Sequence, residues 1–327
     1  MAHEIANING QDCIAFVGEK PWHGLGQELT QSATIETWKK EAGMGYDIVA
    51  APVKFNIEGQ ADAASFARRN VLYRSDTLAP LSVVSDQYHV VQPGEVLEFF
   101  RDLVGAGDMY LETAGVLFGG VRYWAMANTK REAVIGAKDQ LRGRLLLTTA
   151  CDGTQATTAK FVCERVVCNN TLRVALGEKD QVGGVVRRTH GMAFDPKDIK
   201  EKLNLIDAGW ESFISNVNLL AKATVDDAKV KDFIRSIILN PTQLEQVERE
   251  EQLHKRVEQK LAAIFSLYEN GMGADMTRGT LWGAVNAITE HVDHHVGKIA
   301  DNALFNSWYG HGDNLKARAF ETALELV

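Results

Sequence analysis

The stretch LRGRLLLTTACDGTQATTAKFVCERVVC, residues 141–168, decides the fold of this chain. Two β-rich runs, residues 141–151 and 154–167, flank the dipeptide Asp152-Gly153. Glycine tolerates the positive φ of a tight turn, so Asp-Gly between two such runs is among the strongest hairpin signals. The stretch therefore predicts an antiparallel hairpin near the middle of the chain.

The sequence on either side of this hairpin divides into a β-rich half and a helical half. Before it, strands are expected at 46–55, 71–73, 81–84 and 88–91, helices at 34–42 and 93–104, and a second hairpin at 110–118 and 121–127 around Gly119-Gly120. After it, apolar residues recur at helical spacing over 199–220, and further helices are expected at 226–239, 240–268, 280–296 and 314–326. The predicted class is α+β: an antiparallel sheet with hairpins in residues 1–192 and a helical region in residues 193–327, able to pack as one domain.

Composition is that of a globular protein, with 45% hydrophobic and 24% charged residues in a chain of 327. No run of eighteen apolar residues and no basic-then-apolar leader occurs, so we expect a cytoplasmic protein without a membrane partner. The four cysteines form no C-x-x-C pair, which favours neutral thiols in a reducing compartment over a zinc site.

Charge is distributed unevenly along the chain. The formal net charge is −8, yet residues 120–190 hold twelve Lys and Arg against six Asp and Glu. Cations in a β-rich window of an acidic chain are typical of a surface that neutralises phosphates. A solvated sheet face that happens to be basic is the alternative interpretation.

The window predicts a nucleic-acid interface. Arg and Lys contact phosphates, and Asn side chains near a turn suit base edges. Aromatic residues in or near the window (Tyr110, Tyr123, Trp124 and Phe161) can stack on bases, although their alternation places about half of them in the core. The predicted contact residues are Arg142, Arg144, Lys160, Arg165, Asn169, Asn170, Arg173, Arg187 and Arg188.

A histidine cluster offers a different chemistry. His291 and His295 are four residues apart, so on a helix they face the same way, as in a two-histidine zinc pair. Val292 stands where a metalloprotease has Glu, and spacing identifies no third ligand. A polar helix face is the alternative. No phosphate-binding G-x-x-x-x-G-K-[ST] loop occurs, so we expect neither ATP-driven chemistry nor a bound cofactor.

Several segments carry a resemblance when they are taken together and in order. They are residues 21–26, 84–92, 112–115, 152–154, 165–172, 187–190, 282–295 and 310–316. Through these segments the chain resembles the phage- and plasmid-borne family called domain of unknown function 932. Cys151 departs from the pattern, because the resemblance leads us to expect His before Asp152-Gly153.

The resemblance implies a protein carried by mobile genetic elements. Proteins of such elements often handle DNA or counter host defences. The outline of sheet, hairpin and helices is also similar to phage single-strand annealing proteins, which hold single-stranded DNA in rings or filaments without ATP. The leading hypothesis is therefore an oligomeric, ATP-independent single-stranded DNA binder that supports strand annealing. The alternatives are an interaction protein that inhibits a host defence or replication factor, and a metal-dependent enzyme; a binding role is favoured over an enzymatic one.

Overall fold

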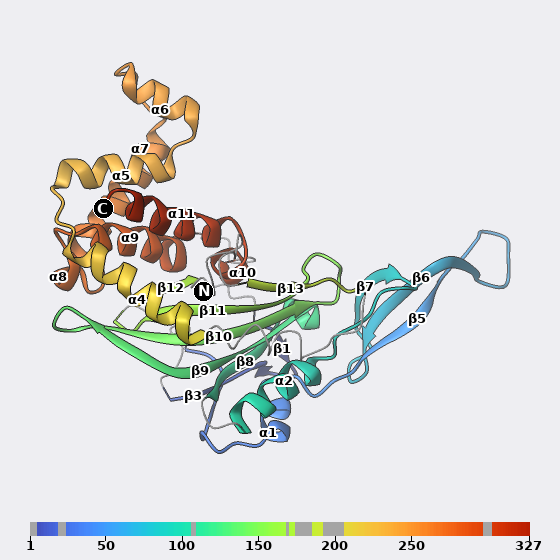
Figure 1. Ribbon diagram of the computed structural model, residues 1–327. Coiled ribbons are helices and arrows are strands. Elements are labelled where there is room, and N and C mark those ends of the chain that lie inside the picture. Colours follow the sequence, from blue (N-terminus) through green and yellow to red (C-terminus); the bar gives the residue numbers. More distant parts are fainter. Residues whose placement is uncertain are drawn as a thin grey trace.

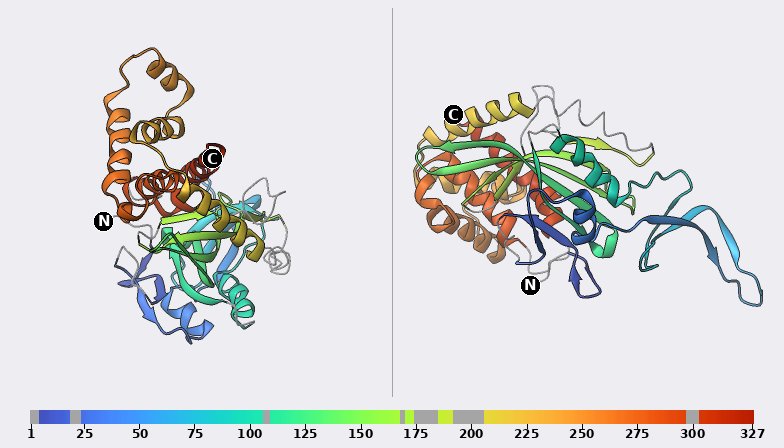
Figure 2. Two further views of the ribbon diagram at one scale, coloured as in Figure 1. Left: turned by 60° about the vertical axis from the view of Figure 1, so that its left-hand side comes forward. Right: turned by 90° about the horizontal axis from the view of Figure 1, so that it is seen from below.

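The computed structural model describes residues 5–18, 24–105, 109–167, 170–173, 185–191, 206–296 and 303–327. Within them, strands fill the N-terminal half and helices the C-terminal half, which confirms the predicted α+β class (Figure 1). The helices α4, α5, α7, α9 and α11 gather at one end of a long sheet, and a second, smaller sheet extends from the other end (Figures 1 and 2).

The large sheet has eight strands in the described residues, in the order β12-β11-β10-β9-β8-β3-β4, with β13 also paired to β11. All its pairs are antiparallel except β3 with β4. Its strands are β3 (Ile14–Val17), β4 (Gln27–Leu29), β8 (Tyr110–Leu117), β9 (Arg122–Ile135), β10 (Asp139–Ala150), β11 (Thr157–Arg165), β12 (Asn170–Arg173) and β13 (Val185–Arg188). A two-stranded ribbon, β1 (Asn7–Ile8) with β2 (Gln11–Asp12), precedes them.

The predicted central hairpin is confirmed as β10 and β11. Pairing ends at Thr148 opposite Thr158, so the connection is longer than a two-residue turn. Asp152 causes the difference, because its carboxylate accepts hydrogen bonds from the backbone and hydroxyl of Thr154 and closes a local turn. Gly153 takes a φ of 76°, the left-handed conformation that its lack of a Cβ permits.

The two faces of this hairpin meet different partners. Phe161 points to the face covered by α4 (Ile206–Lys222), where its ring lies 6.0 Å from that of Trp210. Lys160, one residue earlier, points to the opposite face, where it meets the turn between α10 (Ala303–Trp308) and α11 (His311–Glu325). The helical region therefore packs on both faces of the sheet.

The helices follow the predicted pattern with two corrections, and two short helices at 274–277 and 303–308 were not predicted. Residues 240–268 are not one helix but two, because Glu250 adopts a φ of 58° between them, and the last turn of the predicted helix 280–296 is a π-helix, His291–His295. The predicted start of the helix at 199 lies outside the described residues. The helices are α1 (Ile35–Glu41), α2 (Pro93–Gly105), α4, α5 (Asp227–Ile238), α6 (Pro241–Glu248), α7 (Lys255–Asn270), α8 (Ala274–Thr277), α9 (Leu281–Glu290), α10 and α11. None of the described helices has the length and apolar character that a membrane crossing requires.

Three strand predictions are corrected. Residues 88–91 form no strand, because Tyr88 and His89 bond instead to Ala150 and His190. The strand predicted at 121–127 continues to Ile135 in β9, where it pairs with the start of β10. Residues 170–173, for which no strand was predicted, form β12 and pair with β11.

The smaller sheet, residues 48–85, is named here the arm. It consists of β5 (Ile48–Phe55), β6 (Ala64–Arg74) and β7 (Pro80–Ser85) in the order β5-β6-β7, and it extends away from the rest of the chain (Figures 1 and 2). Its base is fixed by Arg74, whose guanidinium lies 3.5 Å from the centre of the Tyr46 ring and donates to the Gly119 carbonyl. The distal part of the arm is exposed on both faces.

Candidate nucleic-acid interface

Lys160, a predicted phosphate contact, is buried between the sheet and the helical region. Its Nζ lies 2.5 Å from Oδ1 of Asp313 and donates to the carbonyl of Trp308 at 2.5 Å. Burial lowers the pKa of Lys160 to about 8, and the nearby Asp313 carboxylate opposes that effect. The amine therefore serves a contact inside the protein.

Arg144 is likewise enclosed. Its guanidinium is bonded to Glu112 on β8 and to Glu164 on β11, and only 7% of its side chain is exposed. A buried guanidinium that bridges two carboxylates is satisfied by the protein itself. Arg144 thus ties three neighbouring strands together.

Arg165 links the sheet to the helices. Its Nε donates to Oδ1 of Asp139 at 2.6 Å, and its terminal nitrogens donate to the carbonyls of Met272 and Gly273 at 3.1 and 2.9 Å. Trp282 on α9 donates to the other oxygen of Asp139 at 2.8 Å. The group is buried, so its arginine is not available to a phosphate.

The other predicted contacts are divided between internal pairs and the surface. Arg142 bonds to Glu132 at 3.2 Å, and Arg173 lies 3.5 Å from Asp313. Asn169 lies outside the described residues, and Asn170 is described only by its backbone in β12. Of the nine predicted contact residues, Arg187 is exposed and Arg188 is half-buried.

The charge asymmetry of the sequence therefore has a structural origin. Glu112 pairs with Arg144, and Asp313 pairs with Lys160 and Arg173. Both acids lie outside the basic window. The acidic remainder of the chain neutralises much of the window internally. Of the described cations in the window, Lys130 and Lys138 near the β9–β10 turn and Arg187 on β13 remain exposed.

The aromatic residues proposed for stacking are mostly part of the core. Tyr123 and Phe161 are fully buried, and Trp124 packs edge-on against Trp308 with ring centres 5.1 Å apart. Tyr110 is half-buried. None of the first three has a ring face open to solvent, so base stacking requires another aromatic residue.

A second buried polar group joins β12 to the C-terminal helices. Asp293 accepts from the backbone of Thr171 at 2.8 Å and lies 2.6 Å from Nζ of Lys316. Ser307 also donates to Asp293, at 2.5 Å. Thr171, Asp293 and Lys316 come from segments that carry the family resemblance, and their arrangement is that of a structural clasp.

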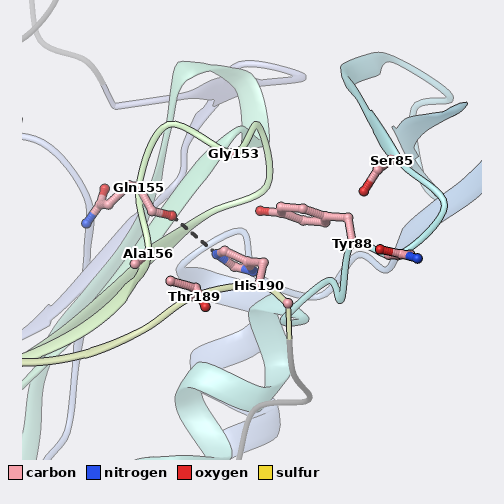
Figure 3. Close-up of a pocket in the computed structure, with 9 residues that line it drawn as sticks. Ser85, Tyr88, Gly153, Gln155, Ala156, Thr189 and His190 are labelled. Atoms are coloured by element: carbon pink, nitrogen blue, oxygen red, sulfur yellow. Dashed lines mark hydrogen bonds between the residues drawn. The ribbon is translucent and has the colours of Figure 1, made fainter.

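A cavity of about 370 Å³ lies where the arm, the central hairpin and β13 meet (Figure 3). We name it the junction cavity. This volume falls at the lower end of the range for small-molecule sites. It is lined by Ser85, Gln87, Tyr88, Gly153, Gln155, Ala156, Thr189, His190 and Gly191.

Two stacked rings form part of its wall. The rings of Tyr88 and His190 lie nearly parallel, at 14°, with centres 4.6 Å apart (Figure 3). His190 Nδ1 lies 2.9 Å from the carbonyl of His89 and Nε2 lies 3.2 Å from that of Gln155. Tyr88 donates its hydroxyl to the carbonyl of Ala150 at 2.9 Å. Both rings are therefore held in fixed positions beside the cavity.

The cavity unites segments that the resemblance had marked separately. Residues 84–92, 152–154 and 187–190 lie far apart in sequence and meet here. Sequence reasoning singled out Asp152-Gly153 and the arginines, but it missed Tyr88 and His190 as a pair. The available signal was their position inside two of those segments.

Cations stand at the edge of the junction cavity. Arg187 and Arg188 directly precede Thr189 in the lining, and Arg122 donates to Thr154 in the turn at 3.0 Å. Arg68 lies 3.7 Å from Asp86, and Asp86 stands between the lining residues Ser85 and Gln87 in the sequence. The cavity thus combines aromatic walls with a partly cationic rim.

Cys151, the departure from the expected pattern, is buried at the base of the turn. Burial raises the pKa of its thiol to about 12, so it is neutral at physiological pH. Its carbonyl accepts from the hydroxyl of Ser82 on β7 at 2.7 Å. The backbone carbonyl of Cys151 therefore links the hairpin to the side chain of Ser82 on the arm.

The histidine cluster gains no further ligand. Among the residues that the structure describes, no group of three His, Cys, Asp or Glu side chains is placed to hold a metal ion. His291 is buried and His295 is exposed, with its Nε2 3.7 Å from Glu290. The metal-centre hypothesis is left with the two-histidine spacing alone.

His291 makes stability depend on pH. Burial lowers its pKa to about 4, below the unfolded value of about 6.5, so the unfolded chain binds the extra proton first. Between pH 6.5 and 4 we expect this residue to remove stability as pH falls, by up to about 1.4 kcal/mol per pH unit. Urea unfolding of the wild type and His291→Gln at pH 7 and pH 5 measures the effect. An equal loss in both proteins would contradict it.

Comparison with known proteins gives the family and nothing beyond it. Neither the curated proteins nor the solved structures contain a match to this chain. One family model, described as a domain of unknown function, matches residues 80–318. The matched range includes the junction cavity and the clasp around Asp293 but not residues 21–26. Since the match covers well over half of the chain, this protein belongs to the family of domain of unknown function 932.

Proposed function

We propose that the protein binds single-stranded DNA without ATP, at the junction cavity and the adjoining strand β13. One observation carries the proposal: the exposed and half-exposed Arg187 and Arg188 lead directly into a cavity walled by the stacked rings of Tyr88 and His190. Cations next to aromatic rings are the pairing that sequence-tolerant binding of single strands requires.

The cationic part supplies affinity for the phosphate backbone. Arg187 and Arg188 on β13 directly precede the lining residue Thr189, and Arg122 on β9 is bonded to Thr154, next to the lining residues Gly153 and Gln155. Neutralising phosphates releases counterions, so binding should weaken steeply as salt rises. The buried Arg144, Lys160 and Arg165 take no part, which narrows the predicted interface to the neighbourhood of the cavity.

The aromatic part supplies the base contacts. A single strand presents unstacked bases, and a ring held rigidly beside a cavity gains about 1–3 kcal/mol per stacked base. The cavity volume of about 370 Å³ suits a single base better than a large cofactor. A duplex keeps its bases stacked inside and offers none to such a cavity, so we expect a preference for single strands.

Substitution of Tyr88 tests the stacking contact. Tyr88→Leu should weaken binding of a labelled oligonucleotide about 5- to 150-fold, because it removes a contact of roughly 1–3 kcal/mol. Tyr88→Phe keeps the ring and loses only the bond to Ala150, so its affinity should stay close to that of the wild type. Fluorescence anisotropy measures both. Equal affinities for the Leu variant and the wild type would remove stacking at Tyr88 from the proposal.

Strand annealing is the activity that such binding supports. A protein that holds strands through backbone and stacking contacts leaves base edges free to pair. Mixing complementary labelled oligonucleotides with the protein, without nucleotide, should accelerate duplex formation. Binding without acceleration would restrict the proposal to strand protection.

A further inference from the structure

The distal part of the arm has an unusual surface for an isolated ribbon. Phe55, Ile57 and Phe66 are 46%, 39% and 54% exposed, although side chains of this kind are normally buried. A two-stranded ribbon with both faces in water is marginally stable by itself. Clustered exposed apolar side chains therefore indicate a contact surface for another molecule.

The turn at the end of the arm is acidic. Residues 55–67 contain Glu58 and Asp62 and no Lys or Arg, whereas Lys54, Arg68 and Arg69 lie on the strands closer to the base. Acidic side chains on the arm tip repel phosphates and favour a protein surface that carries cations beside apolar groups.

The same chain presents such a surface at its opposite end. The far end of the β9–β10 hairpin, residues 130–142, holds four basic and two acidic residues. Lys130 and Lys138 are exposed there, together with Val134, which is 58% exposed. Figures 1 and 2 show the hairpin end and the arm tip at opposite extremes of the molecule.

The backbone of this hairpin end also has room for a partner. The pairing of β8 with β9 ends at Tyr110 opposite Asn128, so in the described residues the rest of β9 pairs with β10 alone. An unpaired strand edge accepts a strand from another chain. The hairpin end therefore offers backbone, apolar and cationic contacts together.

We propose that the arm tip of one copy docks on the β9–β10 hairpin end of a second copy. Glu58 and Asp62 face Lys130 and Lys138 in this contact, and the exposed phenylalanines cover the apolar part around Val134. The eight residues from Pro52 to Gly59 let the arm reach roughly 25 Å from its base, enough to cross onto a neighbour. Because the two surfaces differ, the contact is head-to-tail and produces a ring or a filament.

Charge reversal tests this contact directly, in the absence of DNA. The wild-type mass from light scattering should be a multiple of 36.0 kDa. Glu58→Lys/Asp62→Lys and Lys130→Glu/Lys138→Glu should each shift the mass to that of a single chain, because each places like charges across the contact. The matched control is Glu248→Lys/Glu251→Lys, an equal charge change on exposed residues near α6, which should keep the assembly.

Mixing the two reversed variants completes the test. The basic arm of the first variant then meets the acidic hairpin of the second. The arm of the second and the hairpin of the first are unchanged and remain complementary, so the mixture should regain a high mass. Phe55→Ser/Phe66→Ser should dissociate the assembly in the same way without a charge change. A monomeric wild type, reversed variants that keep the assembly, or a mixture that stays monomeric would each overturn the proposal. These masses are independent of DNA binding, so they separate a failure of the contact from a failure of the proposed function.

Discussion

Asp313→Ala should lower the free energy of unfolding by about 3–5 kcal/mol, the usual cost of removing one partner from a buried ion pair. Asp313 faces Lys160 at 2.5 Å and Arg173 at 3.5 Å. Without the carboxylate, two cations remain enclosed beside each other with no counter-charge. The pKa of Lys160, already lowered by burial, should fall further because Asp313 is the group that raises it.

Denaturant unfolding followed by circular dichroism measures this loss. Glu321→Ala, on the exposed side of the same helix α11, is the matched control and should change stability by less than about 0.5 kcal/mol. Asp313→Asn should fall between the two, because it keeps a hydrogen-bond acceptor for Lys160 but no charge. A loss below 1 kcal/mol for Asp313→Ala would show that Lys160 and Arg173 find solvent, and would reopen them as contacts for DNA.

Arg187→Ala/Arg188→Ala should weaken single-stranded DNA binding by on the order of a hundredfold, if each charge-assisted contact contributes about 1.5 kcal/mol. Loss of two phosphate contacts should also reduce the slope of log affinity against log salt by about 1.4. Anisotropy titrations at several salt concentrations give both quantities. Folding should be unaffected, because the two residues lie at the outer edge of the sheet.

Lys255→Ala/Arg256→Ala is the control for this pair. These are also adjacent, exposed cations, and they lie at the start of α7 on the helical region. Removing them changes the net charge equally, so a general electrostatic effect would weaken binding in both variants. Equal slopes for the Arg187/Arg188 variant and the wild type would mean that DNA, if bound, contacts another surface.

Local signals in the sequence predicted the elements whose conformation is decided locally. Asp152-Gly153 marked the centre of the main hairpin, and Thr34, Asp226, Asn240 and Thr280 begin helices as N-caps. The break at Glu250, where φ is 58°, was missed although no apolar residue occurs between Val247 and Leu253. The arm was underestimated because β6 is irregular near Arg68, where a φ of 57° interrupts the alternation expected of a strand.

The candidate site depended on contacts that no local pattern contains. Alternation places Lys160 and Phe161 on opposite faces of a strand, but it does not show that Asp313, 153 positions further on, covers the first of them. A count of charges in a window therefore described a buried network as a surface. The junction cavity was beyond sequence reasoning for the same reason, since Tyr88 and His190 meet only after the sheet has formed.

The decisive measurement is binding of a fluorescent single-stranded oligonucleotide to the wild-type protein, without ATP and over a range of salt concentrations. We expect binding that weakens steeply with salt, that duplex DNA of the same sequence displaces poorly, and that Tyr88→Leu reduces. Absence of binding at low salt, or binding that prefers the duplex, would contradict the proposed function and assign the junction cavity to a different ligand.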